Sequence, residues 1–211
     1  IKLYSEDIEN LKKHKIERDK GFILYGEPGT GKTMLCKAFA KELNALFVYL
    51  SMEQFVSRKN ENMTIPTLFQ EIDLISKDFP EKTIVVFLDE LDSLRGRGQS
   101  SHNNSYYDGF TNEMLYRIDN LPKNVMIIGA TNNLDKLDKA IIRKGRLGNQ
   151  YEVKNDFKKE EIITFIKNYF SEAKMSTLNK YATFIATMIY YMNGSEISNI
   201  LNKIKQNYYF R

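Results

Sequence analysis

GEPGTGKT, at residues 26–33, matches the pattern of a phosphate-binding loop at every required position. Its glycines let backbone N–H groups curl around phosphate oxygens, and the start of a following helix adds a favourable dipole. In this interpretation the Lys32 ammonium reaches the terminal phosphates of a nucleotide, and the Thr33 hydroxyl is a ligand of Mg²⁺. The predicted nucleotide-binding set is Gly26, Glu27, Pro28, Gly29, Thr30, Gly31, Lys32, Thr33 and the adjoining Met34.

The loop lies between an apolar run typical of a strand, GFILYG at 21–26, and a segment with helical spacing at 32–43. Further apolar runs of strand length and helix-like stretches alternate after it, at 46–50, 65–79, 83–88, 107–120 and 125–129. Uninterrupted apolar runs fit parallel strands buried on both faces, and their alternation with helices predicts right-handed crossovers. We therefore expect a three-layer αβα domain of the phosphate-loop type over residues 1–154.

The sequence changes character after Val153. Apolar residues recur at helical intervals in 158–172 and 178–192, and residues 195–208 have the pattern of another helix. We predict a small helical domain over 155–211. The polar, glycine-containing segment 95–109 has no periodicity and is predicted to be a loop.

Two carboxylates, Asp89 and Glu90, directly follow the apolar run at 83–88. They are expected at the carboxyl end of a buried strand, which is where open α/β sheets bind their ligands. Asp89 would hold Mg²⁺ through water, and Glu90 would polarise the water that attacks the γ-phosphate. Adjacent acids at a strand end are also common as solvated turn residues. The phosphate loop earlier in the chain favours the catalytic interpretation.

Composition argues against several other kinds of site. The single cysteine, Cys36, cannot form an internal disulfide or a cysteine metal cluster, and only two histidines are present. The 31 basic and 27 acidic residues leave a mild charge of +4, far from that of a dedicated nucleic-acid binder. No stretch approaches the roughly 20 apolar residues needed to cross a bilayer. We expect an intracellular protein, cytoplasmic by default. Its organelle stays open, because a sequence that begins at Ile1 suggests an excised piece without its flanking targeting segments.

Taken in order, these motifs resemble those of the AAA family of ATPases, which are hexameric ring machines. GEPGTGKT looks like the family's Walker A motif, and IVVFLDELDSL at 84–94 looks like its Walker B motif. The segment IGATNN at 128–133 resembles the sensor segment, which implies that Asn132 contacts the γ-phosphate and the attacking water. LDKAIIRKGRL at 137–147 resembles the second region of homology, whose two arginines face the neighbouring subunit's nucleotide. The resemblance thus implies Arg143 and Arg146 as arginine fingers.

The resemblance extends to the end of the chain and implies an activity. Gly194 and Ser195 stand where the family has a turn of its helical lid near the adenine and ribose, although a plain helix start with Ser195 as N-cap fits the same residues. The family resemblance implies ATP hydrolysis with Mg²⁺ by a homo-oligomeric ring, a hexamer, that remodels a protein substrate or acts through an adaptor. The implied catalytic residues are Lys32, Glu90, Asn132, Arg143 and Arg146, and the implied metal ligands are Thr33 and Asp89.

Two other functions stay open at this point. One is a nucleotide-dependent assembly module with little turnover, which intact Lys32, Asp89, Glu90 and Asn132 argue against. The other is a nucleic-acid motor or loader, which the modest net charge disfavours. Its basic channel would be lined by Arg58, Lys59, Arg95 and Arg97.

The chain departs from the family pattern at one loop. Members that thread polypeptides carry an aromatic-hydrophobic-glycine tip after the second strand, whereas residues 55–62 read FVSRKNEN here. A charged tip does not favour threading by an aromatic grip. Two branches of the family fit comparably well: severing and remodelling ATPases share the DELDSL-like segment, and mitochondrial inner-membrane chaperones also lack the aromatic tip. The predicted lid also ends at Arg211 after three helices, where the family commonly has four.

Overall fold

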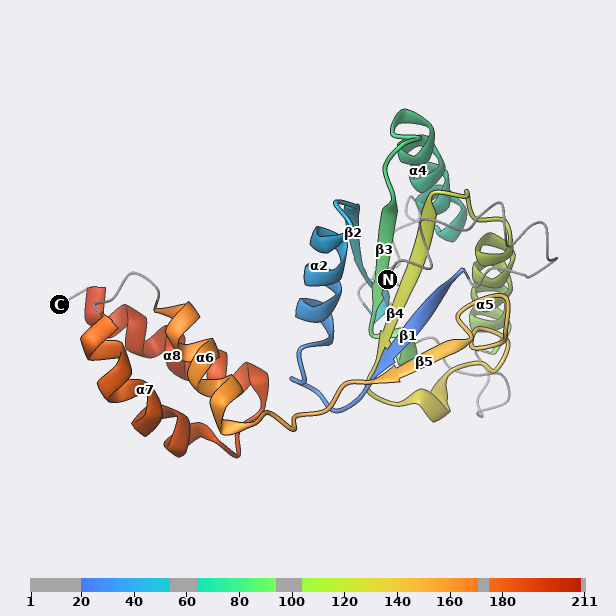
Figure 1. Cartoon of the computed structure of the whole chain (residues 1–211). Coiled ribbons are helices and arrows are strands. Elements are labelled where there is room, and N and C mark those ends of the chain that lie inside the picture. Colours follow the sequence, from blue (N-terminus) through green and yellow to red (C-terminus); the bar gives the residue numbers. More distant parts are fainter. Residues whose placement is uncertain (1–19, 54–63, 94–103, 171–174, 210–211) are drawn as a thin grey trace. The chain divides into compact units, whose positions relative to one another are not determined.

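The computed structural model of the chain describes residues 20–53, 64–93, 104–170 and 175–209. Contacts within it group the chain into two compact units (Figure 1). The first holds the described residues up to Gly26 together with Lys32–Glu152, and the second holds Glu27–Gly31 together with the described residues from Val153 onward. The domain boundary predicted after residue 154 stays a prediction.

The first unit is built on a five-stranded sheet in which every neighbouring pair is parallel. Its strands lie in the order β2-β3-β4-β1-β5. The strands are β1 (Gly21–Tyr25), β2 (Leu46–Ser51), β3 (Ile84–Asp89), β4 (Val125–Thr131) and β5 (Asn149–Glu152). Because all strands run the same way, the residues that follow β1, β3 and β4 meet at one edge of the sheet.

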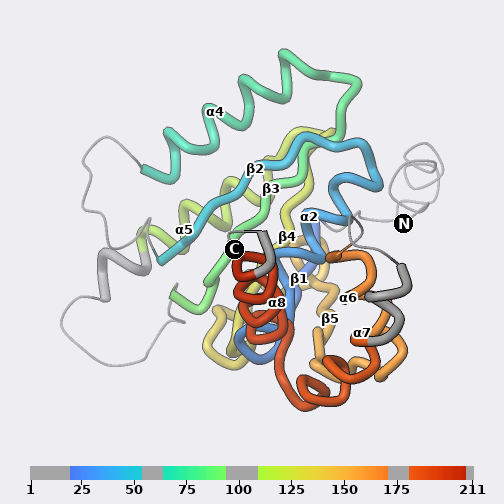
Figure 2. Tube along the Cα trace, turned by 90° about the vertical axis from the view of Figure 1, so that its left-hand side faces the viewer, coloured from blue at the N-terminus to red at the C-terminus, as the bar shows by residue number. Residues whose placement is uncertain are grey.

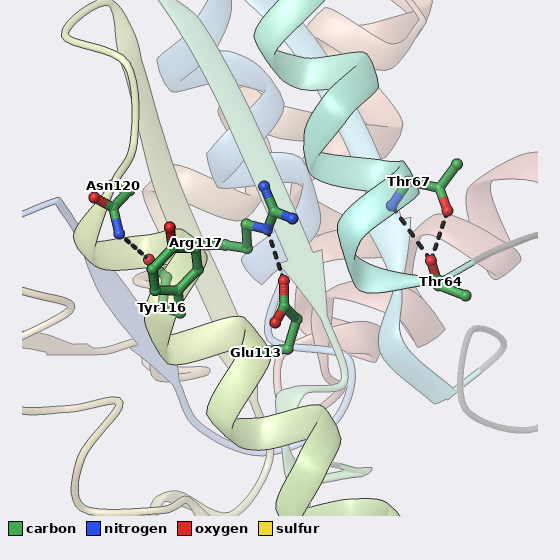
Figure 3. Close-up of polar contacts among 6 residues, drawn as sticks. All are labelled: Thr64, Thr67, Glu113, Tyr116, Arg117 and Asn120. Atoms are coloured by element: carbon green, nitrogen blue, oxygen red, sulfur yellow. Dashed lines mark hydrogen bonds and ion pairs between the residues drawn. The ribbon is translucent and has the colours of Figure 1, made fainter.

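Helices cover both faces of this sheet. Figures 1 and 2 show α2 (Lys32–Glu42) on one face, and α4 (Ile65–Asp78) with α5 (Asn104–Asp119) on the other. Alternate buried residues of β3 share one core cluster with α4 and α5, including Ile84, Val86, Leu88, Ile72, Met114 and Ile118. The start of α4 is capped by the Thr64 hydroxyl, which accepts a hydrogen bond from the Thr67 N–H (3.3 Å; Figure 3). The predicted three-layer α/β architecture is confirmed.

Two elements differ from the sequence-based expectation. All four residues of β5 are exposed, so no apolar run marks this strand, and it forms by pairing its backbone with β1. Helix α5 begins at Asn104, inside the segment 95–109 that was predicted to be a loop. A Cβ atom at Gly109 would meet nothing within 4 Å, so this glycine lies on an open helix face. The later turns of α5 bury Met114 and Ile118. This packing stabilises the helix although its first residues have no helical pattern in the sequence.

The second unit contains helices α6 (Lys159–Tyr169), α7 (Met175–Ile189) and α8 (Gly194–Tyr209). They enclose a separate small core, formed by Ile162, Ile166, Ala182, Ala186, Ile189, Ile197 and Leu201. None of the described helices combines the length and the apolar character needed to cross a membrane. The polar loop tip at 55–62 lies outside the described residues.

Cys36, on α2, is 1% exposed. Burial, together with the negative charge of Asp89, raises the pKa of its thiol to about 12. At pH 8 we therefore expect roughly one thiol in ten thousand to be ionised in the native protein. Iodoacetamide should label native Cys36 very slowly at this pH, and label the guanidinium-unfolded chain at the ordinary rate. Mass spectrometry measures both rates on the chain's single cysteine, and rapid native labelling would contradict the burial.

Candidate active site

The loop 26–33 connects β1 to α2, so the predicted phosphate-binding residues follow the carboxyl end of an internal strand. Gly29 and Gly31 have φ angles of 78° and 91°, in the left-handed region that favours glycine. Helix α2 begins at Lys32, and the first N–H groups of any helix lack partners within it. A loop of this kind presents backbone N–H groups to an anion.

Lys32 and Asn132, one hundred residues apart in the sequence, are in direct contact. The Lys32 ammonium donates to the Asn132 Oδ1 (2.9 Å) and to the Gly26 carbonyl (2.8 Å). Lys32 is only 8% exposed, and burial lowers its pKa, an effect opposed by the nearby carboxylates of Asp89 and Asp92. The structure thus brings the predicted phosphate-directed cation onto the predicted sensor residue.

Thr33 and Asp89, the two predicted metal ligands, also meet. The Thr33 hydroxyl donates to the Asp89 Oδ2 at 3.1 Å, across 56 residues of sequence. A hydroxyl oxygen and a carboxylate oxygen are hard donors of the kind that Mg²⁺ binds alongside nucleotide phosphates. These two side chains therefore fit the metal that the phosphate-loop motif predicts.

Glu90 is held in an unusual backbone conformation at the end of β3. Its φ angle is 57°, in the left-handed region, which costs a non-glycine residue about 1–3 kcal/mol. Three interactions support it: the Ser51 hydroxyl donates to its Oε2 (2.7 Å), its N–H donates to the Asp89 Oδ1 (3.0 Å), and its carbonyl accepts from the Ser93 N–H (2.9 Å). The strained turn directs the Glu90 carboxylate toward Ser51 at the end of β2, next to Asp89 at the end of β3.

The sequence comparisons agree with this geometry. Residues 22–155 match the model of the ATPase family associated with various cellular activities (AAA). This chain belongs to the AAA family. The AAA domain is 37% identical over 150 residues to the protein CdcH of Halobacterium salinarum, an alignment that covers 69% of this chain and 19% of the relative.

Two further relatives are named for different activities. The ATP-dependent zinc metalloprotease FtsH 2 of a Thermoanaerobacter species is 35% identical over 147 residues, covering 68% of this chain and 28% of the relative. The vesicular-fusion protein sec18 of Schizosaccharomyces pombe is 29% identical, covering 93% of this chain and 29% of the relative. This AAA chain therefore spans less than a third of the length of each of these three relatives.

The AAA domain's two candidate finger arginines lie in different surroundings. Arg143 is exposed. Arg146 donates through Nε and one terminal nitrogen to both carboxylate oxygens of Asp119 (2.7 and 2.6 Å), and its other terminal nitrogen donates to the Ala140 carbonyl (2.9 Å). The hydrogen bond from Arg146 lowers the pKa of Asp119. The structure thus places Arg146 against the end of α5 in its own chain.

The other residues predicted to contact the nucleotide belong mostly to the second unit, which holds Glu27–Gly31 as well as Gly194 and Ser195. Met34 lies in the first turn of α2. In the second unit the Ser195 N–H donates to the Gly29 carbonyl (3.3 Å), so the start of α8 touches the phosphate loop. A Cβ atom on Gly194 would lie 3.2 Å from the same carbonyl oxygen, so glycine suits this approach. Thr30 is buried and donates to the Glu27 carbonyl (3.0 Å), while Glu27, Pro28 and Met34 are exposed.

The N-cap of α8 differs from the sequence-based alternative. Asn193, not Ser195, caps the helix: its Oδ1 accepts from the N–H groups of Ser195 (3.1 Å) and Glu196 (3.0 Å). Glu196 reaches back to accept from the Asn193 N–H (2.9 Å), which completes a capping box. Ser195 is therefore the second residue of the helix rather than its cap, and its hydroxyl donates to the Asn193 Oδ1 (2.7 Å).

Three polar residues at the site were not singled out from the sequence. Ser51 ends β2 and holds Glu90, and Tyr49, two residues earlier, donates its hydroxyl to the Asp89 Oδ2 (3.3 Å). Asp92 accepts from the Thr131 hydroxyl (2.8 Å) and from the Asn132 N–H (3.4 Å), and so orients the predicted sensor segment. The only signal for Ser51 was a polar residue directly after an apolar run, which is common at strand ends.

Proposed function

We propose that this AAA domain hydrolyses ATP with Mg²⁺ as a subunit of a homo-oligomeric ring, a hexamer, and uses hydrolysis to remodel a protein partner. The observation that carries the proposal is the contact of Lys32 with both the loop carbonyl of Gly26 and the amide of Asn132. This contact supports a single binding position between the Lys32 ammonium, the start of the loop and the predicted sensor residue. A terminal phosphate there would exchange these neutral acceptors for charged oxygens, which form stronger hydrogen bonds with an ammonium group.

Each residue at the strand ends then has a role. Lys32 neutralises the terminal phosphates, Asn132 contacts the γ-phosphate and the attacking water, and Glu90 polarises that water. Thr33 and Asp89 would hold Mg²⁺, which neutralises charge on the phosphates when it is bound. The support for these assignments is that four separate chain segments, ending β1, β2, β3 and β4, bring their polar groups to the same sheet edge.

For the helical unit we propose the role of a lid over the nucleotide. The contact of Ser195 with the Gly29 carbonyl supports a position for Gly194 and Ser195 near the bound nucleotide. In trans, we propose that Arg143 neutralises charge that develops on the transferred phosphoryl group of the neighbouring subunit. Its exposure supports this assignment, since a finger must reach beyond its own chain.

A protein is the partner that the comparisons favour. One relative is named an ATP-dependent zinc metalloprotease, a class of enzyme whose substrates are proteins. The convergence of Lys32, Asp89, Glu90 and Asn132 disfavours a nucleotide-dependent assembly module with little turnover. The residues that would line a nucleic-acid channel, Arg58, Lys59, Arg95 and Arg97, lie outside the described residues.

The experiment that tests this function is steady-state ATP turnover measured over a series of protein concentrations. Because the proposed site is shared between subunits, specific activity should rise as rings assemble, in parallel with the oligomer seen by light scattering. Removal of Mg²⁺ with EDTA should reduce turnover to background. An unchanged specific activity across the assembly range would contradict the shared site. Salt-sensitive stimulation by DNA or RNA would instead favour the nucleic-acid motor.

A further inference from the structure

Arg146 uses its guanidinium group within its own chain. Two of its nitrogens bind both carboxylate oxygens of Asp119 and the third binds the Ala140 carbonyl, and its side chain is 14% exposed. This two-armed geometry is the strongest that an arginine makes with a carboxylate. To reach a neighbouring subunit, Arg146 would have to break all three hydrogen bonds. Among the residues that the structure describes, no hydrogen bond or ion pair holds the Arg143 side chain in this way.

Asp119 is suited to act as an anchor for Arg146. It is the last residue of α5, whose end is closed by Asn120, where the side-chain amide donates to the Tyr116 carbonyl (2.8 Å; Figure 3). A carboxylate in the last turn of a helix is unfavourable next to the negative end of the helix dipole unless a cation compensates it. Arg146 supplies that cation, and Arg143 and Lys20 add positive charge nearby.

The turn that carries Arg143 is closed around Arg146. The Arg146 N–H donates to the Arg143 carbonyl (3.0 Å), and the Leu147 N–H donates to the Ile141 carbonyl (3.2 Å). The Arg146 carbonyl accepts from the Lys20 N–H (2.8 Å), which ties the turn to the start of β1. Arg143 therefore lies in a turn that backbone hydrogen bonds close between residues 141 and 147, and the Arg146 side chain joins this turn to the end of α5.

We propose that Arg146 is a positioning residue: paired in cis with Asp119, it holds the turn so that Arg143 alone acts on the neighbouring subunit's nucleotide. The inference rests on the proposed function, since it assumes that Arg143 acts in trans. It separates two arginines that the family resemblance treats alike.

The test compares Asp119→Asn, Arg146→Lys, Arg146→Ala and the double variant Asp119→Asn/Arg146→Ala in the full chain. Asp119→Asn keeps the shape of the side chain but removes its charge, and Arg146→Lys keeps the charge but loses the two-armed bond. Each should lower kcat about tenfold through a displaced Arg143, with the KM for ATP and the affinity for a fluorescent ATP analogue unchanged. The kcat of the double variant should be no lower than that of Arg146→Ala alone, because both substitutions remove the same interaction between Asp119 and Arg146.

Glu113→Gln is the matched control. Glu113 also lies on α5 and accepts a hydrogen bond from an arginine, the Nε of Arg117 (2.8 Å; Figure 3). This pair joins two residues one turn apart on the same helix, so it does not hold the turn that carries Arg143. The kcat of Glu113→Gln should stay near that of the unsubstituted chain. If Arg146 were itself the finger, Asp119→Asn would release it and kcat would stay level or rise, and this result would overturn the inference.

The outcome for Arg143→Ala tells the two proposals apart. If Arg143→Ala keeps full turnover, the proposed function has lost its trans finger. If Arg143→Ala loses turnover while Asp119→Asn and Arg146→Lys keep it, only the role given to Arg146 is wrong. The melting temperatures of all variants are measured as well. If Asp119→Asn does not fold, the kcat of Arg146→Lys is compared with that of the unsubstituted chain instead.

Discussion

Lys32→Ala should abolish tight ATP binding, whereas Glu90→Gln should keep ATP binding and lose turnover by about a hundredfold or more. The two effects separate because the residues act at different stages. Lys32 is the buried cation at the loop, and its removal would take away the ammonium group that we propose to contact the terminal phosphates. Glu90 directly follows β3, and its proposed role is to polarise the attacking water; glutamine would keep the shape of the side chain but not its basicity.

Binding of a fluorescent ATP analogue and phosphate release are the two measurements. Lys37→Ala, on the exposed side of α2, and Glu81→Gln, exposed before β3, are matched controls that should change neither. Normal ATP binding by Lys32→Ala, or turnover at the unsubstituted rate by Glu90→Gln, would show that the roles are misassigned.

Arg143→Ala should suppress turnover without abolishing ATP binding, and it should be rescued by mixing with a second inactive variant. When Arg143→Ala subunits are added in excess to Glu90→Gln subunits, some interfaces join an intact Glu90 site to an intact Arg143 from its neighbour. Each variant alone contains no such interface. Recovered phosphate release in the mixture is therefore the expected result, and it measures a site built from two chains.

Lys144→Ala is the control for this experiment, because Lys144 is an exposed cation in the same turn. It should retain turnover on its own. If the mixture recovers nothing and turnover does not depend on protein concentration, the arginine acts in cis or has no role. The molecule would then be a phosphate-loop ATPase that works as a monomer.

Local sequence was sufficient for much of the fold. The phosphate loop requires glycines and a lysine at set positions, and the buried strands β1, β3 and β4 are continuous apolar runs because both of their faces are covered. Patterns of this kind are readable within a window of a few residues. β5 escaped prediction because it is exposed along its length and forms by pairing with β1.

Tertiary structure alone decided which polar groups support the site. Ser51 reaches Glu90 because β2 pairs with β3 in a register that sets Ser51 beside Asp89, and Asn132 reaches Lys32 because β4 lies next to β1. Arg146 meets Asp119 because the turn after residue 137 folds back onto the end of α5. The sequence by itself determined the chemistry at the loop and the acidic pair, since those groups are adjacent along the chain. Strand order and register determined the contacts between groups tens of residues apart, because such contacts depend on how the sheet assembles rather than on any local pattern.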